Sequence, residues 1–204
     1  MTDSLTKLTE ALSQLPGIGP RQSRRLAFWI VRRDTAWVEY FSRALIEARQ
    51  EAHVCALCKR LHPKTTDKDI CTLCVSDARD KKLLMVVERE VDLENIERTG
   101  AYSGRYFVLG GTTSPLDKTP EKSIRIDDLV ARIEDKAEAP DEIIIAASAT
   151  TEGEDTALYL ESRLHDLTNG KGIKMTRLGR GLSTGTELEY VDKETMRHAL
   201  NGRT

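Results

Sequence analysis

The sequence has 204 residues and a formal net charge of −2, from 31 Lys/Arg and 33 Asp/Glu. Apolar residues make up 39%, enough for a hydrophobic core, and the length allows one or two domains. Apolar runs are too short to span a membrane and no secretory signal is visible, so we expect a soluble cytoplasmic protein. The near-zero charge also disfavours a nucleic-acid partner, provided that the charges are evenly mixed.

The charges are in fact unevenly distributed along the chain. Residues 1–82 contain 15 Lys/Arg and 10 Asp/Glu, whereas residues 83–204 contain 16 and 23, so the formal charges are +5 and −7. The stretch 11–33 contains five arginines and no acidic residue. A charged run is most often a solvated face, so it indicates a nucleic-acid surface only if the local backbone also suits phosphate.

The first predicted elements are helices. Leucines at helical spacing predict a helix over 4–14, and Pro20 suits the first turn of a second helix. The segment 15–20 between them is Leu-Pro-Gly-Ile-Gly-Pro, which predicts a tight turn. A third helix is predicted over 35–52. Its apolar residues at helical spacing form the expected inner face: Val38, Phe41, Leu45 and Ala48.

The first two helices and their turn resemble a helix-hairpin-helix DNA-binding motif. Gly17 and Gly19 would let the backbone approach a phosphate, and free N–H groups at the start of the second helix would point at it. Arg21, Arg24 and Arg25 lie on the first turns of that helix and add charge to the same contact. Such binding reads no base sequence. The alternative is a plain helical hairpin, which the acid-free basic helix disfavours.

The cysteines fall in one short segment, as two C-x2-C pairs separated by twelve residues. They are Cys55, Cys58, Cys71 and Cys74. Four thiolates at this spacing can surround one zinc ion, and the closed coordination shell predicts a structural metal. Two disulfides and a redox dithiol are alternatives, disfavoured by the expected intracellular setting and by the presence of two pairs. We expect one zinc per chain, with His53 and His62 outside the ligand set.

From residue 82 onward, strands alternate with helices. Apolar runs predict strands at 83–87, 106–109, 143–147 and 173–178. Periodic segments predict helices over 92–99, from Ile126 to Ile133 and from Ala157 to Leu167. This order predicts an α/β fold with a doubly wound parallel sheet, in which functional sites lie beyond the carboxyl ends of the strands.

Acidic residues follow two of these predicted strands. Glu88 ends the first strand, and Glu152 and Glu154 follow the third. Carboxylates that converge at this edge could hold Mg²⁺. The arrangement resembles the Toprim fold of topoisomerases, primases and some nucleases, although here the second element is Glu-x-Glu and lies several residues beyond its strand. Acids at helix starts are also ordinary partners of the helix dipole, so both interpretations stay open.

In this order the parts are similar to one family over nearly the whole chain. The matching motifs are 15–20, the cysteine unit 55–74, 86–88, Gly110-Gly111, 114–117, 151–157 and 176–190. The sequence resembles RecR, the bacterial recombination mediator family.

The resemblance implies a DNA-repair protein without catalytic activity of its own. RecR proteins form ring-like tetramers that encircle single- or double-stranded DNA, and they act with RecO, and in some settings RecF, to place RecA on single strands coated by single-strand-binding protein. The family's DNA-contacting positions correspond to Arg21 and Arg25, and its zinc ligands to the four cysteines. Glu88, Glu152 and Glu154 fall in the region that contacts RecO. The implied location is the cytoplasm, at the nucleoid.

Four parts are expected along the chain: a helix-hairpin-helix domain over 1–54, a zinc finger over 55–78, a Toprim domain over 79–176 and a C-terminal oligomerisation segment over 177–204. The twelve-residue loop between the cysteine pairs is longer than in several family members. Lys118-Thr119, Ser148-Ala149 and Ser183 also depart from the family pattern.

The alternative function is a small Mg²⁺-dependent Toprim nuclease. Metal-assisted hydrolysis would require Glu88 together with Glu152 or Glu154 to hold the ion. A topoisomerase is disfavoured because the chain is short for strand passage. A zinc-stabilised scaffold without a DNA role is the third hypothesis.

Overall fold

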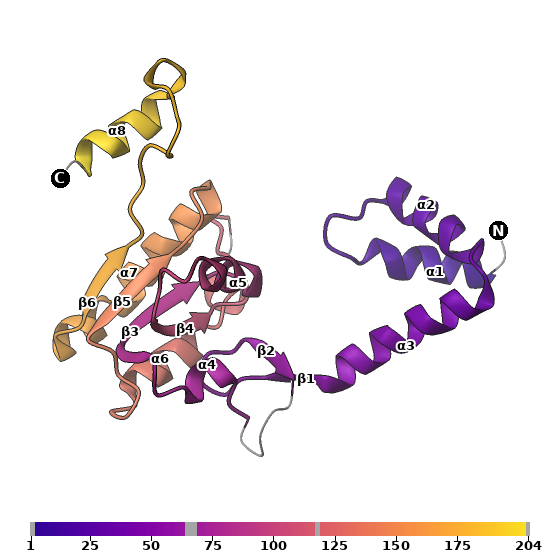
Figure 1. The fold of residues 1–204 in the computed structure, drawn as a ribbon, viewed down its shortest axis with the longest axis horizontal. Coiled ribbons are helices and arrows are strands. Elements are labelled where there is room, and N and C mark those ends of the chain that lie inside the picture. The colour runs from indigo at the N-terminus through magenta and orange to yellow at the C-terminus, as the bar shows by residue number, and fades with distance from the viewer. Residues whose placement is uncertain (1–2, 64–68, 117–118, 203–204) are drawn as a thin grey trace. The chain divides into compact units, whose positions relative to one another are not determined.

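The computed structural model describes residues 3–63, 69–116 and 119–202. It divides into two compact units, one that ends at Ala52 and one that begins at His53. The first unit contains helices α1 (Asp3–Ser13), α2 (Pro20–Val31) and α3 (Thr35–Glu51) (Figure 1). Each of the three helices was predicted from the sequence.

In the first unit, α1 and α2 pack on each other as a helical hairpin. Ser23 and Ala27 are the buried residues of α2. The Asp34 side chain caps α3 by accepting a hydrogen bond from the Trp37 N–H at 2.8 Å. The expectation of a buried inner face on α3 was wrong for a single chain, because no residue of this helix is buried and Leu45 is 58% exposed.

The second unit is built on a four-stranded parallel sheet of β3 (Asp80–Val87), β4 (Gly104–Val108), β5 (Glu142–Ala146) and β6 (Lys174–Arg177). The strand order is β4-β3-β5-β6, so β4 and β6 form the edges. Val87 pairs with Val108 on one side and with Ala146 on the other, which brings the carboxyl ends of three strands together. The four predicted strands and the parallel sheet are confirmed.

Helices cover both faces of this sheet, as a doubly wound fold requires. These helices are α5 (Glu90–Thr99), α6 (Ile126–Glu134) and α7 (Thr151–Lys171) (Figure 1). Leu84 and Val86 of β3 point into a core with α6 and α7, represented by Leu129 and Leu160. The alternate residues of β3 point into a smaller core with α5. The alternation explains why the β3 sequence is apolar on both faces.

The cysteine segment precedes the sheet and belongs to the same compact unit. It consists of a two-stranded sheet, β1 (Ala52–Val54) and β2 (Leu61–Pro63), and the short helix α4 (Thr72–Val75). Leu73 of α4 packs against the core that α5 covers. The central part of the twelve-residue loop lies outside the described residues.

After β6 the chain continues through a short 3-10 helix, η2 (Leu188–Tyr190), to the helix α8 (Lys193–Asn201). Another 3-10 helix, η1 (Pro120–Lys122), precedes α6. Asp192 caps α8 by accepting hydrogen bonds from the N–H groups of Glu194 and Thr195, each at 2.9 Å. Over the described ranges, none of the helices is long and apolar enough for a membrane span.

Candidate metal centre and nucleic-acid interface

The four cysteines converge on one buried position. Their ligand atoms all lie within 4.8 Å of one another, and every one of the four residues is at most 3% exposed. The Sγ atoms of Cys58 and Cys71 are 3.5 Å apart, and the cysteines are free rather than disulfide-bonded. The predicted cluster is therefore present, and its geometry could hold one metal ion.

Electrostatics explain why these sulfurs require a cation. Hydrogen bonds from Cys58, Cys71 and Cys74 hold the pKa of the Cys55 thiol well below its usual range. Hydrogen bonds to Cys55, Cys58 and Cys71, together with burial, raise the pKa of Cys74. Four thiolates this close repel one another, so all four are deprotonated together only when a dication balances their charge.

Backbone bonds hold the sulfurs in place. The Lys59 N–H donates to the Cys55 carbonyl at 3.0 Å, and the Cys71 N–H donates to the Cys55 Sγ at 3.3 Å. Lys59 itself adopts a left-handed conformation, with φ of 62°, which closes the turn after the first cysteine pair. Its Nζ forms an ion pair with the Asp128 carboxylate of α6 at 2.7 Å.

The first cysteine turn is docked on the edge strand β4. The Val108 N–H donates to the Cys58 carbonyl at 2.8 Å, which continues the sheet ladder into the metal site. The Arg125 guanidinium, just before α6, donates to the Lys59 and Val108 carbonyls, each at 3.3 Å.

A second arginine makes a similar bridge from inside α6. Arg132 is 6% exposed, and its Nη1 donates to the Leu57 carbonyl at 3.1 Å and to the Tyr106 carbonyl at 2.7 Å. It thereby joins the metal site to β4. Sequence reasoning missed this residue; the available signal was its position three residues after Leu129, next to the apolar face of α6.

The hairpin turn has the backbone that a phosphate contact requires. Gly17 has φ of +76°, a left-handed conformation that favours glycine. Gly19 is the N-cap of α2 and provides no side chain to cap it, and Pro20 occupies the first helical position. A Cβ built on Gly19 would meet none of the described atoms within 4 Å. The fold itself therefore leaves open space at Gly19, where a ligand can approach the backbone.

The predicted DNA-contacting arginines lie on the same helix as this turn. Arg21, Arg24 and Arg25 are all exposed on α2. In the described part of the chain, Arg21 and Arg25 have no ion-pair partner. Their charge is therefore available to an anion, and the positive end of the helix dipole adds to it.

Glu88 is buried and already engaged. It is 4% exposed, and its carboxylate accepts hydrogen bonds from the Ser148 N–H at 2.8 Å and the Ser148 hydroxyl at 2.7 Å. A Cβ on Gly153 would lie 2.1 Å from the Ser148 carbonyl oxygen and 3.0 Å from Glu88 Oε1. The glycine of the Glu-Gly-Glu motif is therefore required for the first turn of α7 to reach β3 and β5.

Glu154 is engaged by two arginines from the end of β6 and beyond. Its carboxylate accepts bonds from Arg177 at 2.5 Å and Arg180 at 2.7 Å, and Arg177 also contacts Glu161 at 2.6 Å. The Arg177 contact, followed by that of Arg180, lowers the pKa of Glu154. Because the folded-state pKa is lowered, this pairing stabilises the fold above the usual carboxyl range and is lost as pH falls through the lowered value.

The three acids are not gathered around one metal position. Within the described ranges, the cysteine cluster is the group of three or more ligating side chains that could hold an ion. Glu152 is exposed, while Glu88 and Glu154 are committed to different partners. Sequence reasoning missed these partners, Ser148, Arg177 and Arg180, because the contacts join segments distant in sequence.

The departures from the family pattern have different structural settings. Ser148 donates two hydrogen bonds to Glu88, one from its N–H and one from its hydroxyl. Ser183 is exposed in the segment after β6. Lys118 lies outside the described residues.

Comparison with known proteins agrees with these observations. Family models match residues 5–49 as "RecR, helix-hairpin-helix", 82–179 as "Toprim domain" and 181–204 as "RecR, C-terminal". A curated protein from Bdellovibrio bacteriovorus, named Recombination protein RecR, is 40% identical, with 98% of this chain and 96% of the relative covered. Proteins of the same name from Lactobacillus acidophilus (38% identical; 98% and 96% covered) and Roseiflexus castenholzii (40%; 97% and 91%) are similarly related. The chain belongs to the RecR family of recombination proteins.

Proposed function

We propose that this protein is a DNA-binding mediator of recombinational repair. It binds the sugar–phosphate backbone through the helical hairpin of α1 and α2. The observation that carries the proposal is the open backbone at Gly19 beside Arg21 and Arg25, which have no ion-pair partner among the described residues. The open space at the Gly19 backbone, the helix dipole and two cations at one place suit a phosphate. Because these groups contact no base edge, the binding is independent of sequence.

The partners that we propose are those of the family: RecO, in some settings RecF, and indirectly RecA, in the cytoplasm at the nucleoid. The formal charge of −7 over residues 83–204 supports separate roles for the two parts, with the hairpin binding DNA and the acidic part binding proteins. An acidic surface attracts basic partners and repels DNA. Exposed Glu152, beside the engaged Glu88 and Glu154, offers such a surface at the start of α7. We propose this region as the contact for RecO.

We further propose that the protein has no hydrolytic activity. Metal-assisted hydrolysis would require carboxylates free to bind Mg²⁺. Glu88 is instead satisfied by Ser148, and Glu154 by Arg177 and Arg180. These contacts favour a recognition surface over the alternative of a Toprim nuclease.

The metal proposed for the cysteine cluster is one structural zinc per chain. Soft thiolate ligands in a closed set of four favour zinc over hard cations such as Mg²⁺. The burial of the cluster, and its attachment to β4 and α6, support a structural role.

A homo-oligomer, of the tetrameric kind found in the family, is proposed from the uncovered face of α3. Leu45 and Ile46, which are consecutive residues of α3, are 58% and 57% exposed. Exposed apolar side chains that adjoin one another mark an interaction surface. A second copy of the chain would cover it.

The DNA contact is tested by replacing both arginines, Arg21→Ala/Arg25→Ala. Affinity should fall on single- and double-stranded DNA of any sequence, and the slope of log K against log salt should become shallower by roughly 1.5, because two phosphate contacts are lost. Fluorescence anisotropy over a salt series measures both. The charge-matched control Lys136→Ala/Arg163→Ala, with two exposed cations of the second unit, should leave both unchanged. Unchanged affinity in the hairpin variant would contradict the proposal.

The metal assignment is tested by elemental analysis of protein purified without chelator. Zinc should be present at about one equivalent per chain, because four thiolates complete one shell. Cys58→Ser should lower the zinc content severely, whereas His62→Gln, at a buried histidine of the same segment, should retain it. Loss of zinc in the histidine variant, or much less than one equivalent in the parent, is the contrary result.

The assembly is tested by solution mass. The parent chain of 22.9 kDa should sediment as a multiple of that mass, and Leu45→Glu/Ile46→Glu should shift it toward the monomer by placing charge in the proposed contact. Leu116→Glu/Leu158→Glu changes two exposed leucines of the second unit and serves as the matched control. A strictly monomeric parent would rule out the oligomer.

The absence of hydrolysis is tested by incubating the protein with labelled DNA and RNA in Mg²⁺ or Mn²⁺. No cleavage above the buffer control is expected, because the carboxylates already have protein partners. Cleavage that disappears in Glu88→Gln would establish the nuclease alternative. Cleavage that persists in this variant would indicate a contaminating enzyme.

A further inference from the structure

We propose that α2 carries a second DNA subsite, in which unstacked bases of single-stranded DNA stack on Phe28 and Trp29. This inference rests on the proposed function and adds to it the form of DNA that is preferred. The hairpin backbone explains contact with phosphate, which single and double strands share. Farther along the same helix, Phe28 and Trp29 are exposed aromatic side chains, which can contact bases as well as phosphates.

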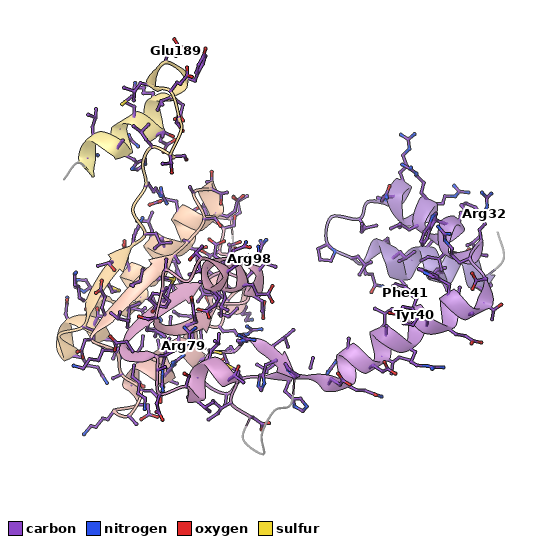
Figure 2. The ribbon with its side chains drawn as sticks, in the orientation of Figure 1. Arg32, Tyr40, Phe41, Arg79, Arg98 and Glu189 are labelled. Atoms are coloured by element: carbon purple, nitrogen blue, oxygen red, sulfur yellow. The ribbon has the colours of Figure 1, made fainter. Side chains whose placement is uncertain are left out.

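An open hollow of about 440 Å³ is lined by residues of α2 and its C-terminal end, namely Arg25, Phe28, Trp29, Arg32 and Arg33. Their spacing of three and four residues places them on one stripe of the helix. Arg21, four residues before Arg25, extends the stripe to the turn, and Arg32, labelled in Figure 2, lies near its other end. A strand bound at the turn can therefore continue along α2.

The two aromatic side chains of the stripe are available to a ligand. Phe28 is 41% exposed and Trp29 is 47% exposed. The Trp29 ring is held edge-on to Trp37 at 5.2 Å, and Trp37 stacks on Phe41, also at 5.2 Å. This contact orients Trp29 while leaving about half of it exposed. A pre-oriented aromatic ring loses little conformational freedom when a base stacks on it.

The charges around the rings select a nucleic acid among possible occupants. Arg33 lies over the Trp29 ring, with its guanidinium carbon 3.8 Å from the centroid, and a guanidinium plane is itself a stacking surface for bases. Arg25 and Arg32 have no ion-pair partner in the described chain. The charged residues that line the hollow, Arg25, Arg32 and Arg33, are all cations. Aromatic rings interleaved with cations are how proteins bind single strands.

The bases of a duplex are stacked on one another and cannot reach this site, whereas those of a single strand can. The subsite should therefore raise affinity for single strands above that for duplexes. The relevant probe is a short oligothymidine, compared with an abasic oligomer of the same length that keeps every phosphate and lacks every base. Electrostatic binding alone treats these two alike.

The first measurement uses intrinsic fluorescence, because the chain has two tryptophans, Trp29 and Trp37. In the variant Trp37→Phe, which keeps an aromatic partner for Phe41, emission comes from Trp29. Oligothymidine should quench this emission strongly and saturably, and the abasic oligomer should not, because quenching requires a stacked base. Equal effects of the two oligomers, or no effect of either while both bind, would overturn the inference.

The second measurement compares affinities. The parent should bind oligothymidine about tenfold more tightly than the abasic oligomer, the gain expected from stacking. Trp29→Leu should abolish this ratio while leaving the affinity for duplex unchanged. Tyr40→Leu, at an exposed aromatic residue of α3, is the matched control and should keep the ratio (Figure 2).

The outcomes separate this inference from the proposed function. If Arg21→Ala/Arg25→Ala weakens all DNA binding while the parent binds oligothymidine and the abasic oligomer with equal affinity, the stacking subsite is wrong and the phosphate contact stands. If the arginine variant binds as the parent does, the phosphate contact is wrong. Trp29→Leu could instead lower the solution mass of the protein and keep the ratio of affinities for oligothymidine and the abasic oligomer. The stripe would then be a contact between protein chains, which also overturns the inference.

Discussion

The second unit depends on the attachment of the first cysteine turn to the edge of its sheet. Val108 donates its N–H to the Cys58 carbonyl, and Arg132 donates to carbonyls of both Leu57 and Tyr106. An exposed edge strand would present unpaired backbone groups to other chains, and this attachment covers the carboxyl end of β4. Because the same carbonyls belong to the turn that positions two thiolates, the free energy of metal binding and the stability of the sheet edge are linked.

A second constraint acts at the carboxyl ends of the strands, where α/β folds usually place their sites. Here the polar groups satisfy one another. Glu88 accepts hydrogen bonds from the N–H and the hydroxyl of Ser148. Gly153 packs closely against both residues because it has no side chain. Glu154 forms ion pairs with Arg177 and Arg180, which attach the beginning of the segment between β6 and α8 to the first turn of α7. The result is a polar edge at which Glu88 and Glu154 are both engaged within the chain.

The sequence predicted those features whose cause is local. The C-x2-C spacing, the turn at 15–20 and the apolar runs of the strands each depend on neighbouring residues, and the corresponding elements are present. The face of α3 was predicted as apolar, but periodicity cannot say what covers it, and Leu45 is exposed in the single chain. The partners of Glu88 and Glu154 could not be predicted, because strand order decides which distant segments meet. Arg132 was missed because burial of a charge depends on carbonyl acceptors that a sequence pattern does not reveal.

The position of the metal site along the chain has a consequence for biosynthesis. All four thiols precede the groups that hold their first turn: β4 begins at Gly104 and α6 at Ile126. During translation the thiols therefore emerge from the ribosome before the strand and the helix on which they dock. Until α6 is synthesised, the nascent cysteine segment lacks its contact with Arg132. The contacts that dock the first cysteine turn therefore form across 50 residues, from Cys58 to Val108, and across 75 residues, from Leu57 to Arg132.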